Sequence, residues 1–227
     1  MPPMPKETDR AEVVLKQANL SVKHFRNACL TVRAQRGGSM GPPTVGEQDL
    51  IRASLIFAAA GLDSTIKELI KGSIKSLAEN DTLVQKGLET YATRQIKDDK
   101  DGLSGKNGAS FLAKILVSTS PYEQLVENYT RWLTGSSLQS LDELFKASNA
   151  LGITISLIND KNKELKEAFD VRNKIIHELD IKFDAVHGSK NRNSRTKDKL
   201  DCMSDLFLGI AEEFIKAVNK KILKNVK

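Results

Sequence analysis

The sequence predicts an all-α fold, and three observations support this prediction. Aromatic residues make up only 5% of the 227 residues, so the core must consist mainly of Leu, Ile, Ala and Val, which suits helix packing better than a β-sandwich. All but one of the six prolines lie within the first 43 residues, which leaves long stretches free for helices. Apolar residues recur at helical spacing along several of these stretches. We expect one helical bundle over residues 8–227, after a disordered lead over residues 1–7.

The first half of the chain divides into helical stretches. Apolar residues recur at helical spacing over residues 8–36, and a segment rich in Gly and Pro, residues 36–46, ends this helix. The next helix, residues 47–70, is apolar on nearly all sides and should be buried in the middle of the fold. Gly61 costs this helix about 1 kcal/mol in propensity, which a close approach of a second helix would explain. Residues 73–97 are more polar and indicate one or two shorter helices.

The second half begins with a charged segment, residues 97–108, that we expect to be a flexible loop. The apolar residues 111–117 follow, and their pattern fits a helix or a strand. Helices are then expected over residues 120–133, where a proline occupies the first turn, and over residues 135–153, where Gly152 marks the end.

The last third contains two further predicted helices joined by a basic segment. The first spans residues 160–181, and the second is amphipathic and spans residues 200–223. Residues 186–199 lie between them and are polar and basic, so we expect a loop there. Its basic side chains could bind the backbone of RNA through counterion release, or could simply be solvated. The candidates for this contact are Lys190, Arg192 and Arg195.

The composition limits the class of protein and its surroundings. The formal net charge of +6 favours contact with polyanions, and it fits a basic protein surface without such a function as well. The two cysteines, Cys29 and Cys202, lie on predicted helices without metal-type spacing, which indicates a reducing compartment. No apolar run approaches the roughly 20 residues that span a bilayer, and the first residues lack the apolar core of a signal peptide. We therefore expect a cytoplasmic protein without membrane contact.

The motif with the clearest chemical meaning is Arg-Asn-Lys-Ile-Ile-His, residues 172–177. Asn173 and His177 are four residues apart and share a face of the predicted helix. Arg172 and His177 are five apart, about 140° around an ideal helix, so the long arginine side chain and a helix end near His177 would help to bring them together. Attack by the 2′-hydroxyl of RNA needs proton transfer, for which histidine is suited near neutral pH. It also needs donors to phosphate, which arginine provides.

One chain supplies only one suitable histidine, although such a reaction needs both a base and an acid. A two-fold dimer would bring two histidines and two arginines into one cleft. In the alternative interpretation, Arg172 pairs with Glu167 or Glu178 on the helix surface, and His177 lies near a helix C-terminus, where positive charge is favoured. The sequence indicates neither a metal site nor a cofactor, because it has no His, Cys, Asp and Glu cluster with ligand spacing and no glycine-rich phosphate loop.

With this motif, the chain resembles the HEPN superfamily of small all-helical bundles, many of which carry an R-x(4–6)-H motif near the end of a late helix. The residue after the arginine is often Asn, Asp or His, and here it is Asn173. The stretches VRAQRGG, DLIRASLIFAAAGLDSTIKEL and SLQSLDELFKASNALGI are similar to this group as well, so the resemblance covers about residues 10–220. It implies metal-independent RNA cleavage between two protomers, with Arg172 on the scissile phosphate, His177 in proton transfer and Asn173 supporting them.

The resemblance also implies a biological setting. HEPN proteins similar to this chain act as toxins or as effectors of phage defence, so an antitoxin or a defence-system partner is expected besides RNA. Some HEPN toxins carry a tyrosine two residues after the histidine, which a partner nucleotidyltransferase modifies. Leu179 occupies that position here, and this regulation is therefore not expected. Asp63 is a further candidate for a supporting residue, or it is only the partner of Lys67 one turn on.

Two other functions remain open at this point. The chain could be a module that binds RNA, nucleotides or a partner protein without cutting. Its RNA binding would then fall with salt and survive the loss of His177. Alternatively, it could be a helical adaptor in which Arg172 and His177 form only local salt bridges. Alanine at either position would then leave its biochemical properties nearly unchanged.

Overall fold

The computed structural model describes residues 6–37, 41–97, 106–182 and 192–225, and in these ranges the fold is all-α, as predicted. An isolated antiparallel bridge joins Ile181 and Arg192. In chain order the elements are the 3-10 turn η1 (Lys6–Thr8) and the helices α1 (Asp9–Gln35), α2 (Val45–Asn80), α3 (Thr82–Lys97), α4 (Lys106–Leu116), α5 (Pro121–Thr134), α6 (Leu141–Ala150), α7 (Ser156–Asp160), α8 (Asn162–Glu178) and α9 (Lys197–Asn225).

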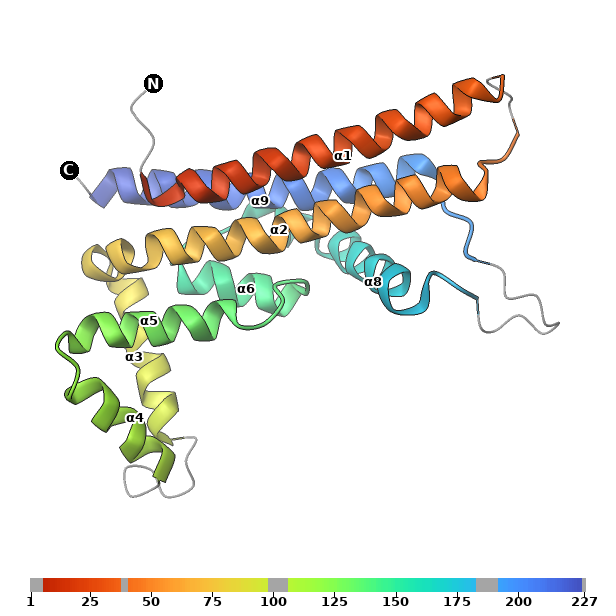
Figure 1. Ribbon diagram of the computed structural model, residues 1–227. Helices are drawn as coiled ribbons and strands as arrows, with labels where there is room; N and C mark the ends of the chain where they lie inside the picture. The colour runs from red at the N-terminus through yellow and green to blue at the C-terminus, as the bar shows by residue number, and fades with distance from the viewer. Residues whose placement is uncertain (1–5, 38–40, 98–105, 183–191, 226–227) are drawn as a thin grey trace.

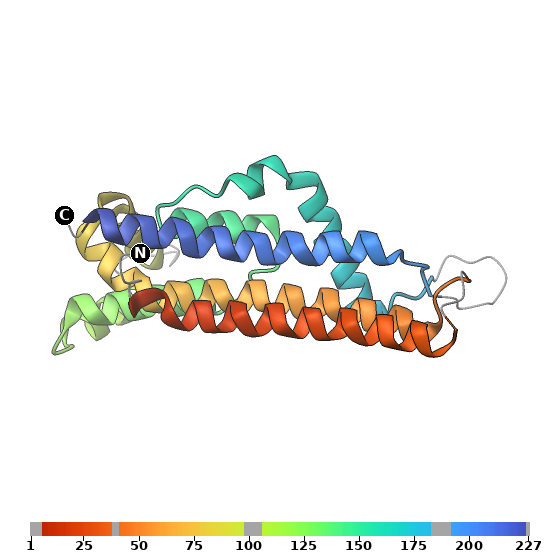
Figure 2. The ribbon, with the colours of Figure 1, turned by 90° about the horizontal axis from the view of Figure 1, so that it is seen from above.

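The three longest helices, α1, α2 and α9, lie side by side and form one layer of the molecule (Figures 1 and 2). The shorter helices α3, α5, α6 and α8 lie on one face of this layer, below α2 in Figure 1. Helices α3, α4 and α5 form an arm at one end, whereas α8 crosses beneath the layer and ends toward the other end. The arm and the end of α8 are therefore separate regions of the molecule.

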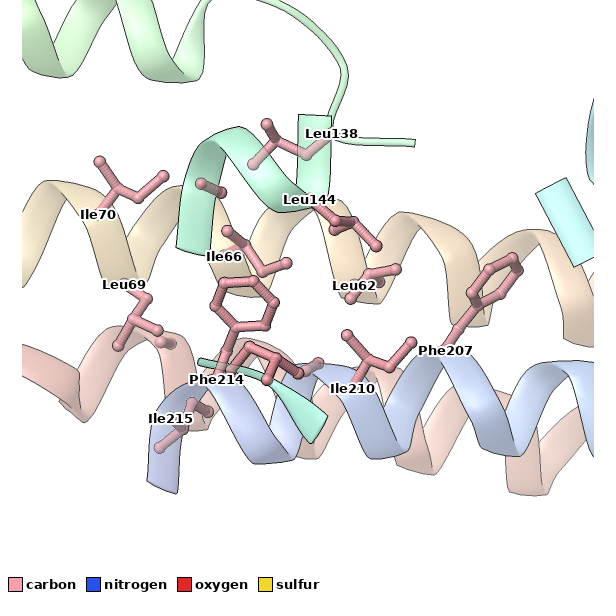
Figure 3. Packing of buried hydrophobic residues seen from close by; sticks show 14 of the residues in the cluster. Leu62, Ile66, Leu69, Ile70, Leu138, Leu144, Phe207, Ile210, Phe214 and Ile215 are labelled. Atoms are coloured by element: carbon pink, nitrogen blue, oxygen red, sulfur yellow. The ribbon is translucent and has the colours of Figure 1, made fainter. Parts of the chain in front are cut away.

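The core confirms that α2 is the central helix, as its apolar sequence predicted. It packs against α1 and α9 along the long layer and against α5 and α8 on the other side. Figure 3 shows the part of the core between α2, α9 and α6, where the labelled side chains are Leu62, Ile66, Leu69, Ile70, Leu138, Leu144, Phe207, Ile210, Phe214 and Ile215. Burial of this apolar surface is the main stabilising contribution to such a bundle.

Both ends of α2 lie outside the predicted range. The helix begins at Val45, two residues earlier than predicted, because Thr44 and Glu47 form a capping box in which each side chain accepts from the other's backbone N–H. It continues past residue 70 to Asn80 because Ile74 and Leu77 extend the buried stripe. The polar stretch 73–97 is thus the end of α2 followed by α3.

The predicted close approach at Gly61 is confirmed. A Cβ added to Gly61 would lie 2.3 Å from the Cβ of Ala18, so α1 passes directly over this glycine. The two helices can pack this closely only because no side chain separates them.

Replacement of Gly61 by alanine should therefore destabilise the protein by about 1–3 kcal/mol, the usual cost of overpacking a core. This would outweigh the gain of about 1 kcal/mol that alanine brings to an unstrained helix. Urea unfolding followed by circular dichroism measures the difference. An additional Ala18→Gly substitution should recover part of the loss by restoring the space, and a Gly61→Ala protein more stable than the wild type would contradict the packing.

Three other predicted boundaries are wrong. Residues 6 and 7 belong to η1 and not to a disordered lead, because Thr8 is fully buried and its hydroxyl donates to Oδ1 of Asn219 at 2.8 Å. Helix α4 begins at Lys106, inside the predicted loop 97–108, of which residues 98–105 lie outside the described ranges. The apolar residues 111–116 thus belong to a helix. The predicted helix over 135–153 is only α6, which Ser140 caps by accepting from the N–H of Glu143.

None of the helices within the described ranges combines the length and hydropathy needed to cross a bilayer.

Candidate active site

Helix α8 carries the Arg-Asn-x-x-x-His motif and is fixed by an apolar stripe. Leu165, Ala168, Phe169 and Ile175 are buried, and the ring of Phe169 packs on Phe207 of α9 with 4.9 Å between centroids. The stripe follows the helical period, which is why this polar segment still forms a helix against the layer. Residues 156–160 form the separate short helix α7, and α8 itself starts at Asn162. The helix ends at Glu178, three residues earlier than predicted, so His177 lies in its last turn.

Arg172 lies on the half-buried side of α8. Its terminal nitrogen Nη1 donates to Oδ1 of the neighbouring Asn173 at 2.9 Å. Its Nε is buried and has no hydrogen-bond partner within the described ranges. Burial lowers the pKa of the Arg172 guanidinium below its ordinary value, and the negative charge of Asp63 opposes this shift. An arginine remains protonated despite such a shift, so the motif contributes a partly desolvated positive charge.

Asp63 lies on α2 near this cation. Its Oδ2 pairs with Lys67 at 3.0 Å, which is the local partner expected from the sequence. Its Oδ1 accepts the backbone N–H of Leu138 at 2.7 Å, which fixes the connection between α5 and α6. The negative charge of Asp63 also favours the protonated form of the Arg172 guanidinium. The charge of Asp63 thus acts on Arg172, which lies more than a hundred residues further along the chain, while its hydrogen bond and ion pair go to Leu138 and Lys67.

His177 is exposed at the end of α8, on the side that it shares with Asn173 one turn earlier. Because α8 is continuous through residues 172–177, the separation of about 140° between Arg172 and His177 remains. Arg172 therefore points toward the bundle and His177 toward solvent. Two large apolar side chains beside the histidine are also exposed, Ile176 at 36% and Leu179 at 59%.

The turn after His177 contains a buried carboxylate that the sequence reasoning missed. Leu179 and Asp180 both adopt left-handed backbone conformations, with φ of 50° and 58°. The N–H of Asp180 donates to the carbonyl of Lys174 at 2.9 Å, which closes the helix in a Schellman-like manner. The side chain of Asp180 is fully buried. Non-glycine residues adopt this conformation at a cost of about 1–3 kcal/mol each, so strong contacts must hold the turn.

Two arginines and an asparagine supply these contacts. Arg52 Nε donates to Asp180 Oδ2 at 3.1 Å, Asn193 Nδ2 donates to Oδ1 at 2.9 Å, and Arg195 donates to both oxygens at 3.1 and 2.6 Å. Burial alone would raise the pKa of Asp180, but the hydrogen bonds from Arg195, Asn193 and Arg52 outweigh it and lower that pKa below its usual value. We call these four residues the Asp180 cluster. It ties the end of α8 to α2 and to the segment before α9.

The cluster changes the interpretation of the basic segment. Arg195, predicted to contact RNA, is used inside the protein by Asp180, with only 17% of its side chain exposed. Arg192 forms an ion pair with Asp49 of α2, which also accepts from Arg52 at 3.1 Å. Lys190 lies outside the described residues. Residues 197–199 belong to α9 and not to the predicted loop.

One signal in the sequence could have indicated the cluster. Asp180 follows closely on a helix C-terminus, where the helix dipole disfavours negative charge. A carboxylate in that position needs cationic partners, and arginines were available nearby in the sequence. What the sequence did not reveal is Arg52, which lies 128 residues before Asp180.

The donor side chains of the described ranges do not suggest a metal centre, since no group of three or more His, Cys, Asp or Glu residues there could hold an ion.

The all-helical bundle and the Arg-Asn-x-x-x-His motif, which ends in the last turn of α8, both resemble HEPN-type domains. The comparisons agree: the family model described as RiboL-PSP-HEPN matches residues 38–223. The chain belongs to this RiboL-PSP-HEPN family, which indicates a nuclease-like or RNA-related module. No curated protein and no solved structure matches the chain significantly.

Proposed function

We propose that this chain is a metal-independent endoribonuclease that acts as a homodimer, and that it serves as a toxin or as an abortive-infection effector against phage. The observation that carries the proposal is the exposed His177 in the last turn of α8, beside Asn173 and a partly desolvated Arg172, in a chain of this family. An exposed histidine is accessible to a substrate, and the helix that presents it is anchored at its end by the Asp180 cluster.

In the proposed reaction, the 2′-hydroxyl oxygen of RNA forms a bond to the adjacent phosphorus, and the bond from phosphorus to the 5′-oxygen of the next nucleotide breaks. One His177 takes the proton from the 2′-hydroxyl, and the His177 of a second protomer gives a proton to the leaving 5′-oxygen. Arg172 donates to the non-bridging phosphate oxygens as negative charge develops on them. The products are a 2′,3′-cyclic phosphate and a 5′-hydroxyl end.

The surface around His177 supports a dimeric site. Helix α8 of a single protomer presents only His177 to solvent for proton transfer, with Arg172 on the other side of the helix. Ile176 and Leu179 provide exposed apolar surface next to the histidine, which a second copy related by a two-fold axis would cover. The arginine of each protomer would reach the shared cleft by rotation of its long side chain.

The test is cleavage of total RNA by the purified protein in excess EDTA. The proposal expects cleavage, with 2′,3′-cyclic phosphate ends, and a specific activity that falls on dilution as the dimer dissociates. Full activity from a monomer at micromolar concentration would contradict the shared site. Activity that EDTA abolishes would contradict the metal-independent reaction.

A module that binds RNA without cutting is the second candidate. The observation that favours it is the separation of Arg172 and His177 around α8, which places the two side chains on different sides of the helix within one protomer. This candidate predicts RNA binding that weakens with salt and is unchanged in a His177→Ala variant.

A further inference from the structure

The arm formed by α3, α4 and α5 lies away from the end of α8 that carries the motif (Figure 1). Its helices contain a cluster of aromatic rings. Tyr91 lies at its centre, with ring centroids 5.2 Å from Tyr129, 5.4 Å from Trp132 and 6.2 Å from Phe111. Trp132 is half-buried and is the only tryptophan in the chain. The chain has few aromatic residues overall, so their concentration here calls for an explanation beyond general packing.

Two surface hollows meet at Tyr91. One, of about 290 Å³, lies between α3, α5 and α6, and the aromatic residues Tyr129 and Trp132 line it. The other, of about 410 Å³, lies between α4 and α5 beside Phe111. Tyr91 lines both hollows and lies between them, with only 7% of its surface exposed. We call the two hollows the arm groove.

The charges of the arm groove are of one sign. Its described lining residues include four cationic side chains and no Asp or Glu: Arg94 and Lys146 in the first hollow, and Lys114 and Arg131 in the second. Lys146 lies over the ring of Trp132, 4.1 Å from its centroid. Glu143 pairs with Lys146 and Glu127 with Arg131 from outside the hollows. An exposed pair such as Glu127–Arg131 contributes about 0–1 kcal/mol, and the Glu143–Lys146 pair is partly exposed, so a phosphate can compete for Arg131 and Lys146.

Polar groups in the first hollow are also available for a ligand. The hydroxyl of Tyr129 has no hydrogen-bond partner within the described ranges, and Gly87 leaves the space beside it open, since an added Cβ would lie 3.0 Å from that oxygen. Burial raises the pKa of Tyr129 to about 12, so the hydroxyl keeps its proton and remains a donor. The Tyr129 hydroxyl can therefore donate a hydrogen bond to the edge of a base that enters the first hollow.

We propose that the arm groove binds single-stranded RNA, with a base in the first hollow against Trp132 and the flanking phosphates on Lys146 and Lys114. Stacking aromatic rings combined with cations is the usual chemistry of single-strand binding. Lys146 would leave the indole face and contact a phosphate while a base takes its place. The choice of RNA rests on the proposed function, whereas the site itself is separate from Arg172 and His177 and does not depend on cleavage.

The experiment uses the fluorescence of Trp132, which reports on this groove alone because the chain has no other tryptophan. A labelled adenosine hexamer of RNA is titrated into the His177→Ala protein, so that the ligand stays intact. Quenching of Trp132 and the anisotropy of the label should give the same affinity. The Lys114→Gln and Lys146→Gln variants should each bind several-fold more weakly, and each should reduce the slope of log affinity against log salt by about 1.

Lys216→Gln is the matched control, because Lys216 is an exposed helix lysine that pairs with Glu212 on α9, outside the arm. It should leave affinity and quenching unchanged. Absence of quenching at low salt, or equal affinity in the groove variants and the control, would overturn the proposal. A DNA hexamer that binds as tightly as RNA would overturn the assignment to RNA. If the wild type cleaves RNA but Trp132 of the His177→Ala protein is not quenched, this inference alone fails. If Trp132 is quenched but the wild type does not cleave RNA, the proposed reaction alone fails.

Discussion

Replacement of Asp180 by alanine is expected to lower the free energy of unfolding by about 3–5 kcal/mol, the usual loss when one partner of a buried ion pair is removed. The side chain of Asp180 is fully buried, and it accepts hydrogen bonds from Arg52, Asn193 and Arg195. Without it, the nearly buried Arg52 would lose its main buried anion. The turn at residues 179–180 would also lose the contacts that offset its left-handed backbone. Urea unfolding at neutral pH measures the change.

Asp49 provides a matched control, because it pairs with two arginines as Asp180 does, Arg52 and Arg192, but its side chain is 48% exposed. Asp49→Ala should cost less than about 1 kcal/mol, since solvent screens such pairs. Equal losses in the two variants would contradict the distinction between a buried and an exposed cluster of charges.

The same cluster should make stability depend on pH in a defined direction. The pKa of Asp180 is lower in the folded protein than in the unfolded chain, where a carboxyl of this type titrates near pH 4. Its contribution to stability is therefore complete above about pH 4, and it is lost as the pH falls through the lowered folded-state pKa. The difference in unfolding free energy between the wild type and Asp180→Asn should shrink below that range. A difference that stays constant down to low pH would show that charge is not its cause.

The second large effect is expected on catalysis. His177→Ala should reduce the rate of RNA cleavage at least 100-fold, because a positioned acid or base contributes on the order of 100- to 10,000-fold. The side chain is exposed, so its removal should leave thermal stability nearly unchanged. Initial rates of cleavage on one RNA substrate, measured with the variant and the wild type at equal concentration, give the ratio.

His24→Ala serves as the control, because His24 is also an exposed helix histidine, on α1 in the long layer. It should cleave RNA at the wild-type rate. If both variants are equally active, His177 takes no part in the reaction and the proposed function fails. If both variants remain folded but are equally inactive, the loss of activity cannot be assigned to a role of His177 in the reaction.

Much of the fold could be predicted from the sequence because helical periodicity is a local signal. The first helix, the buried character of α2 and the close approach at Gly61 all follow from residues within one or two turns of each other. The position of the motif near the end of a late helix was predicted for the same reason. Helix ends were less predictable, since α2 continues to Asn80 along its buried stripe, past the polar residues that suggested an earlier end.

The surroundings of the site could not be predicted, because they depend on contacts between distant parts of the chain. The sequence around Arg195 is typical of a solvated basic loop. Only the fold shows that Arg195 and Arg52 both donate hydrogen bonds to the buried carboxylate of Asp180. Likewise, nothing near Asp63 in the sequence indicates that its charge acts on Arg172. Local patterns identify which residues have the chemistry to bind a ligand. Tertiary contacts decide which of these residues are instead bonded to other groups of the protein.

The contact between η1 and α9 also affects the order in which the protein can fold during synthesis. The hydroxyl of Thr8 bonds to Asn219, 211 residues further along the chain. Helix α9 leaves the ribosome after every other described helix, and Phe207 on it supports the helix that carries His177. A nascent chain therefore presents α8 without its supporting surface until translation has passed α9. For a protein proposed to cut RNA, this delay would keep the site unformed until α9 has left the ribosome.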